Sequence, residues 1–185
     1  FDGLAGIKRV EISIIKHDIS DYYWTGSSWT LNETWKVVTG TETWTYLGAS
    51  WGDQKYHTIV VRAKDNSIPE NYEVPGDSLT FIYDVTEPDS GVTVPVESNL
   101  SSLTTISGTA SDAFGVTGVE VSIRNTTDGK EWDTGGTSTW TVTDETLWHT
   151  ANWFSEYGVW YIIAPSFEDD KTYLIRTRAI DTATN

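Results

Sequence analysis

Three aspartates lie where apolar alternation gives way to turn residues, and their carboxylates are candidate metal ligands. Asp84 follows the apolar run Leu79–Tyr83, Asp112 ends a strand-like stretch, and Asp181 ends the run Tyr173–Ile180. Ca²⁺ is a hard cation that takes about six to eight oxygen ligands, so these side chains suit it if the fold brings them together. The alternative is that each aspartate caps its own turn by accepting hydrogen bonds from nearby backbone N–H groups.

Tryptophan is unusually abundant, with ten residues in a chain of 185. A flat indole face stacks on a sugar ring, which predicts carbohydrate binding, whereas core packing and cross-strand aromatic pairs are the alternative. Two tryptophan pairs recur at similar places in the two halves of the chain, which favours a role in the fold: Trp24 with Trp132, and Trp29 with Trp140. The candidates for sugar binding lie in the poorly matched stretch Leu147–Pro165, which we interpret as a variable insertion: Trp148, Trp153 and Trp160.

Asn-x-Ser/Thr sequons occur at Asn32, Asn99 and Asn125 and are candidate glycosylation sites. An exported chain from a source with N-glycosylation machinery would use them. Such triplets also arise by chance in a chain rich in serine and threonine, so a role without glycans stays open.

Catalytic chemistry has less support than binding. None of the three histidines lies in a recognisable nucleophile motif, and the sequence has no Gly-x-Ser-x-Gly, phosphate loop or His-Glu-x-x-His. The numerous acidic residues leave a glycosidase pair open as an alternative. We expect a protein that is not an enzyme.

The segments that would position these residues occur twice. Val10–Ile14 is repeated as Val119–Ile123, and Tyr56–Asn66 is repeated as Thr172–Thr182. Apolar and polar residues alternate in Val119–Ile123, which is the pattern of a half-buried strand. A repeat of roughly a hundred residues is long enough to form a domain, so the chain predicts two tandem modules.

Composition narrows the class of protein further. The net charge of −15 and the pI near 4.3 disfavour nucleic acid and anionic membranes as partners. No apolar run is long enough for membrane insertion. The chain has no cysteine, which excludes thiolate metal sites and cysteine nucleophiles. Threonine, serine, glycine and aromatic residues are abundant and no helical periodicity is present, so we predict an all-β fold.

The chain resembles the immunoglobulin-like repeats of large bacterial and archaeal cell-surface proteins. The family usually closes its unit with Asp-x-Ala-Gly-Asn, and Asp181–Asn185 keeps most of this motif with Thr184 in place of glycine. The other motifs that carry the resemblance are Ile106–Asp112 followed by Val116–Ile123, Trp24–Trp29, the late Arg-Ala-x-Asp, and the linker Tyr83–Pro88. The resemblance implies two tandem immunoglobulin-like β-sandwich domains, residues 1–83 and 84–185.

In such a sandwich the entering linker, the loop after the second strand and the loop after the sixth strand lie at one pole. The resemblance therefore implies that Asp84, Asp112 and Asp181 meet in the second domain, with Asp2 and Asp65 at the equivalent pole of the first. We predict calcium as the bound ion, in a position where it would stiffen the joint between repeats.

The resemblance also implies that both domains are incomplete. The first would lack its first two strands, and the second would lack its seventh, which leaves unpaired edges. Two explanations stay open. The chain is a segment of a longer repeat array, or a neighbouring chain donates the missing strands.

The expected function is that of a structural or adhesive repeat segment in a large extracellular surface protein, surface layer or filament. Its partners would be neighbouring repeats of the same or another chain, together with glycans. The alternative is an accessory carbohydrate-binding module of a secreted polysaccharide-degrading enzyme, because such modules serve several functions. Coplanar, solvent-facing indoles on one sheet would favour the module, and buried indoles would favour the structural role.

Overall fold

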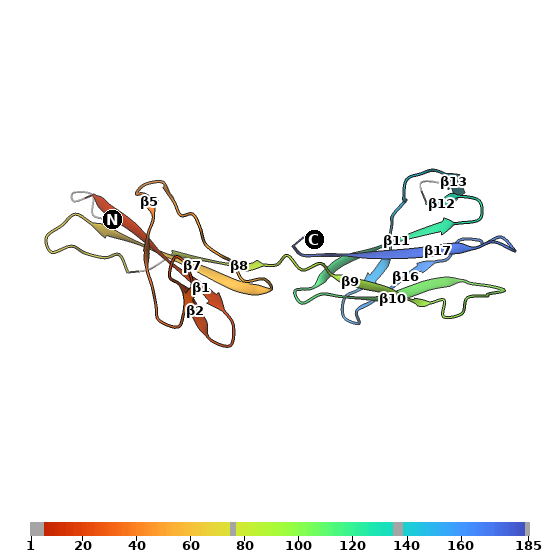
Figure 1. The fold of residues 1–185 in the computed structure, drawn as a ribbon, viewed down its shortest axis with the longest axis horizontal. Helices are drawn as coiled ribbons and strands as arrows, with labels where there is room; N and C mark the ends of the chain where they lie inside the picture. The colour runs from red at the N-terminus through yellow and green to blue at the C-terminus, as the bar shows by residue number, and fades with distance from the viewer. Residues whose placement is uncertain (1–5, 75–76, 135–138, 184–185) are drawn as a thin grey trace. The chain divides into compact units, whose positions relative to one another are not determined.

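The fold consists of β-strands and loops. The computed structural model describes residues 6–74, 77–134 and 139–183, and all regular structure in these ranges is β, in seventeen strands. The prediction of an all-β fold is confirmed. The chain divides into two compact units, Phe1–Val85 and Thr86–Asn185 (Figure 1). None of the described segments is a helix long and apolar enough to cross a membrane.

The first unit is built on one antiparallel sheet in the order β3-β2-β1-β7-β8, with β4 also paired to β1 and a separate hairpin of β5 and β6. Val10, Ile12 and Ile14 alternate along β1 and form its buried core with Trp24 and Val38. The strands are β1 Ile7–His17, β2 Asp21–Trp24, β3 Trp29–Thr30, β4 Lys36–Val37, β5 Thr39–Gly40, β6 Trp44–Thr45, β7 Lys55–Asp65 and β8 Asp77–Tyr83.

The second unit has two sheets. One has the order β15-β16-β10-β9, and the other has the order β13-β12-β11-β14 with β17 paired to β11. The strands are β9 Asp89–Val94, β10 Thr105–Ser111, β11 Val116–Asn125, β12 Lys130–Asp133, β13 Thr139–Val142, β14 His149–Thr150, β15 Asn152–Phe154, β16 Val159–Ile163 and β17 Tyr173–Asp181.

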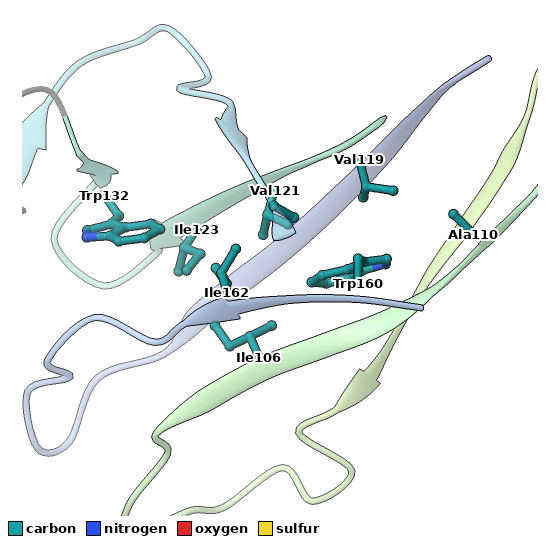
Figure 2. Close-up of a cluster of buried hydrophobic side chains, with 9 residues drawn as sticks. Ile106, Ala110, Val119, Val121, Ile123, Trp132, Trp160 and Ile162 are labelled. Carbon is teal, nitrogen blue, oxygen red and sulfur yellow. The ribbon is translucent and has the colours of Figure 1, made fainter. Parts of the chain in front are cut away.

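The core of the second unit lies between these two sheets, as in a β-sandwich. Figure 2 shows side chains of β10, β11 and β16 converging there. Trp160 is the largest of them, and its ring lies over Gly108 in the neighbouring strand. A Cβ atom at Gly108 would lie 2.5 Å from that ring and 1.8 Å from the carbonyl oxygen of Gly91, so only glycine fits this position. The buried members of the core are Ile106, Ala110, Val119, Val121, Ile123, Trp132, Ala151, Trp160 and Ile162.

The two units share one strand register. Val10 pairs with Ala63 in the first unit, as Val119 pairs with Ala179 in the second. Both long pairs also contain an irregularity at the equivalent place, between Ile7 and Arg9 in β1 and between Val116 and Gly118 in β11. The repeat seen in the sequence is therefore a repeat of backbone pairing as well.

This register shows that our interpretation of Leu147–Pro165 as an insertion was wrong. The segment contains β14, β15 and β16, of which β14 pairs with β11 as β4 pairs with β1. The hairpin of β15 and β16 likewise corresponds to that of β5 and β6. The sequences diverge here because β16 also pairs with β10 and carries Trp160 and Ile162 into the core of the second unit, whereas β6 pairs with β5 alone.

A buried histidine organises one end of the first unit. His57 is fully buried, with the rings of Trp29, Trp51 and Phe81 at centroid distances of 5.3 to 5.9 Å. Its Nε2 accepts a hydrogen bond from the backbone N–H of Gly52 at 3.1 Å, which requires the neutral ring. Burial lowers the pKa of His57, and the hydrogen bond between its Nδ1 and the carbonyl of Lys55 opposes this only in part.

We predict that the first unit loses stability as the pH falls through about 6.5, the ordinary pKa of histidine. The unfolded chain takes up a proton there, and folded His57 does not until the pH is lower, so protonation favours unfolding. The melting temperature of the first unit should therefore fall between pH 7.5 and 5.5.

The variant His57→Gln should flatten this dependence, and the control His17→Gln, at a half-exposed position, should retain it. A melting temperature of the first unit that is unchanged over this pH range would contradict the assignment of a buried neutral ring.

Candidate functional site

The structure brings together the three predicted metal ligands. Asp84 directly follows β8, Asp112 directly follows β10, and Asp181 is the last residue of β17. One carboxylate oxygen from each lies within 4.8 Å of the other two. Asp181 is 1% exposed and Asp84 8% exposed, while Asp112 is half-buried. Three acidic side chains from distant parts of the sequence therefore form one shielded cluster.

A local hydrogen bond holds Asp112, and a long-range pair of hydrogen bonds holds the backbone at Asp181. The Oδ1 atom of Asp112 accepts a hydrogen bond of 2.7 Å from the N–H of Phe114, which starts a turn with Gly115 at φ +99°. The hydroxyl of Thr117 then donates to the carbonyl oxygens of Ile180 and Asp181 at 2.9 and 3.1 Å. The start of β11 is thereby attached to the end of β17.

The donor set fits a hard divalent cation. Each of the three carboxylates offers one oxygen to the cluster, and Ca²⁺ takes about six to eight oxygen ligands, so backbone carbonyls or water would have to complete its coordination. Carboxylates this close repel one another in a shielded place, and a cation is one way to offset that repulsion. Asp112 can both cap its turn through Oδ1 and present Oδ2, so capping and metal binding are compatible at this residue.

The first unit does not repeat this arrangement in the residues that the structure describes. Asp2 lies outside the described residues. The carboxylate of Asp65 accepts hydrogen bonds from the N–H and hydroxyl of Ser67 and from the N–H and side-chain amide of Asn71. These bonds, led by the one from the backbone of Asn71, hold the pKa of Asp65 far below its ordinary value. Asp65 therefore has the turn-capping role that was the alternative to metal binding.

The three tryptophans predicted to bind sugars occupy different environments. Trp160 is 1% exposed and donates its indole N–H to the carbonyl of Thr109, so it presents no face to solvent. Trp153 is half-buried, packs against the core and donates to the carbonyl of Val116. Trp148 is half-buried and lies against Arg178, whose guanidinium is 4.4 Å from the indole centroid.

Trp148 belongs to a stack that both units share. In the second unit Glu120 pairs with Arg178 at 2.6 Å, and Arg178 lies over Trp148. The same order is found in the first unit, where Arg62 pairs with Glu11 at 2.6 Å and lies 3.8 Å from the Trp35 centroid. A side chain with the same partners in both units has a role in the fold. We therefore assign Trp148 to the scaffold and not to a binding site of the second unit.

The sequons differ in accessibility. Asn32 and Asn99 are exposed. Asn125 is 2% exposed, its amide donates to Asp128, and its Oδ1 accepts from the N–H groups of Thr127 and Asp128. Asn125 holds a turn together and leaves no room for a glycan on the folded protein.

Two aromatic features were missed by the count of tryptophans. A groove of about 910 Å³ in the second unit is lined by residues that include Trp140, His149, Phe167 and Glu168. On the outer face of β15 and β16, the rings of Phe154 and Tyr161 stack at 5.7 Å with 11° between their planes. Side chains alternate along β16, so Tyr161 points outward while its neighbours Trp160 and Ile162 are buried. This alternation was the sequence signal that could have identified Tyr161 as an outward-facing aromatic residue.

No protein-family model and no curated protein matches this chain. The informative comparison is therefore between its own two units. The stack of glutamate, arginine and tryptophan is common to both, whereas the acidic cluster of Asp84, Asp112 and Asp181 has no second copy in the part of the chain that the structure describes.

We predict that Trp160→Ala destabilises the second unit by about 3 to 5 kcal/mol, because it removes the largest of the fully buried side chains. Trp148→Ala should cost less, about 0.5 to 1 kcal/mol, because it removes a stacking contact with an exposed arginine. Urea unfolding followed by circular dichroism measures both. Equal losses of unfolding free energy for the two variants would contradict these assignments. Trp35→Ala is the matched control for Trp148→Ala, because Trp35 holds the same place in the stack of the first unit.

Proposed function

We propose that this chain is a non-enzymatic, structural or adhesive segment of immunoglobulin-like repeats in a large extracellular surface protein, surface layer or filament. The observation that supports this most is the shared strand register of the two units, with an equivalent irregularity in each long strand pair. Tandem copies of one scaffold are typical of proteins that set a distance or present a surface.

A calcium ion at Asp84, Asp112 and Asp181 is part of this proposal. The three side chains would hold the ion, and the ion would supply charge neutralisation and a rigid connection among the three segments that carry them. Asp84 lies in the linker, so binding would fix the linker to the turn after β10 and to the end of β17. A repeat protein under load would benefit from such a fixed linker.

The acidic surface supports an extracellular location within the same proposal. A net charge of −15 keeps copies soluble and attracts cations to the surface. Extracellular media supply Ca²⁺ at the concentrations that modest carboxylate sites require.

Calcium should raise the melting temperature relative to EDTA, because an ion that binds only the folded state adds about 2.7 kcal/mol at a hundred times its Kd. Asp112→Asn should lose this gain, since it removes one ligand charge and keeps an Oδ1 acceptor for Phe114. In EDTA the same variant should be more stable than the wild type, because one repulsive charge is gone. Calorimetric melting of the full chain, wild type and Asp112→Asn, each in calcium and in EDTA, measures these differences in melting temperature.

Asp144→Asn is the charge-matched control, because Asp144 is exposed in the same unit. It should respond to calcium as the wild type does. A melting temperature that is equal in calcium and in EDTA would remove the ion from the proposal.

The mechanical role itself is tested by pulling the full chain from its two ends. We expect two unfolding events, one for each unit. Calcium should raise the unfolding force of the second unit. A chain that yields at very low force without discrete events would contradict a load-bearing function.

An accessory carbohydrate-binding module is the second candidate. The groove that contains Trp140, His149 and Phe167 supports it, since it combines aromatic faces with hydrogen-bonding groups. A polysaccharide panel with Trp140→Ala as the matched variant separates the two functions. Binding that this variant abolishes would favour the module, and an absence of binding across the panel would favour the structural role.

A further inference from the structure

The outward face of β15 and β16 carries a preformed aromatic pair. Tyr161 lies between Trp160 and Ile162, which point into the core (Figure 2), so its own side chain points outward. Its ring packs against that of Phe154, with the centroids 5.7 Å apart and 11° between the ring planes. Phe154 is 45% exposed and Tyr161 36%. Two rings in contact hold each other in place, so a ligand that binds them has little side-chain ordering to pay for.

A row of hydroxyl groups lies beside these rings on β10. The residues of β10 alternate between buried and outward-facing. Because β10 pairs directly with β16, Ser107 lies opposite Tyr161 and Thr109 opposite Val159. On the other side of Tyr161, Asn152 adds a side-chain amide. The outward hydroxyl residues of β10 are Thr105, Ser107, Thr109 and Ser111.

This face is neutral in a strongly acidic chain. None of the residues of β10, β15 and β16 is charged, although 21% of the whole chain is. The other sheet of the same unit differs, since its outward side chains form ion pairs such as Glu120 with Arg178. The absence of charge selects for a neutral ligand. The row of hydroxyl groups interrupts the apolar area, which favours a ligand rich in hydroxyl groups over an apolar protein surface.

The first unit shows that the fold does not require the aromatic pair. The residue before each hairpin donates its N–H to the equivalent residue of the long strand, which aligns β5 and β6 with β15 and β16. Thr39 then pairs with Thr45 in the place where Asn152 pairs with Tyr161. Threonine therefore replaces the tyrosine in the first unit. A side chain that differs between the two units is available for a ligand.

We propose that the outward face of β10, β15 and β16 binds a neutral, β-linked glycan chain. The rings of Phe154 and Tyr161 stack on the C–H faces of the sugar units. The hydroxyls of Ser107 and Thr109 and the amide of Asn152 exchange hydrogen bonds with the sugar hydroxyls. An extended β-linked chain has flat apolar faces and hydroxyl groups along its edges, which matches the exposed surface of a sheet. This inference rests on the proposed function, because it names the ligand of an adhesive repeat.

Isothermal titration of the full chain with cellohexaose, chitohexaose and xylohexaose tests the ligand class. At least one of these neutral, β-linked probes should bind. Maltohexaose, which is neutral but α-linked and coiled, should bind at least about tenfold more weakly. The hexamer of galacturonic acid should not bind, because the net charge of −15 repels it.

Variants of the two rings test the site. Phe154→Ala and Tyr161→Ala should each weaken binding at least about tenfold, whereas Tyr161→Phe keeps the ring and should keep most of the affinity. Tyr56→Ala is the matched control, because Tyr56 is a tyrosine of β7 in the first unit that is 48% exposed. Trp140→Ala, in the groove of the second unit, should also bind as the wild type does. The melting temperature of each variant shows that it is folded.

Chemical shifts locate the bound glycan. In NMR spectra of the full chain, the backbone amides of Ser107, Thr109 and Tyr161 should shift as the probe is added. The amide of His149, which lines the groove, should not shift.

A lack of binding by all three β-linked probes, or equal binding by Tyr161→Ala and the wild type, would overturn this inference. Binding that Trp140→Ala abolishes and the two ring variants keep would also overturn it, in favour of the groove. Self-association that the ring variants abolish, without glycan binding, would overturn it and identify a protein interface instead.

The inference and the proposed function fail in different ways. A chain that responds to calcium and to pulling but binds no glycan would overturn the inference and leave the function standing. A chain that binds glycan at these rings without either response would keep the inference and contradict the mechanical role.

Discussion

Each unit depends on one long antiparallel strand pair, β1 with β7 and β11 with β17. Side chains alternate along such strands, so a slip of one residue would exchange the apolar and polar faces. The pairing sets Glu11 opposite Arg62 and Glu120 opposite Arg178, so the correct register also joins opposite charges on the polar face. Burial on one face and ion pairing on the other thus favour the same alignment, and the remaining strands attach to it.

Sequence patterns predict the elements whose signal is local. Alternation in Val119–Ile123 identifies β11, and repetition identifies the cross-strand pair of Trp24 and Trp29 with its counterpart Trp132 and Trp140. The role of Trp148 could not be predicted in this way. Its partner Arg178 is thirty residues away, and only the folded register brings the two side chains together.

The aspartates show the same distinction between local and distant effects. Asp65 is followed within its own loop by Ser67 and Asn71, whose donors satisfy its carboxylate. Asp112 has one such local bond, from Phe114, and its remaining surroundings come from distant segments that end at Asp84 and Asp181. A carboxylate satisfied by its own loop is predictable from nearby residues, whereas a cluster assembled from three segments requires the fold.

Several apolar side chains of the first unit remain in contact with water, among them Leu47 at 89% and Leu79 at 64% exposure. The charge of −15 opposes contact between copies through these residues. This repulsion has a range of about 10 Å in 0.1 M salt and about 3 Å in 1 M salt. In dilute buffer it acts beyond the length of a side chain, and in concentrated salt it does not. We therefore expect ionic strength to govern the colloidal behaviour of the chain, with dispersed copies at low salt and apolar association at high salt.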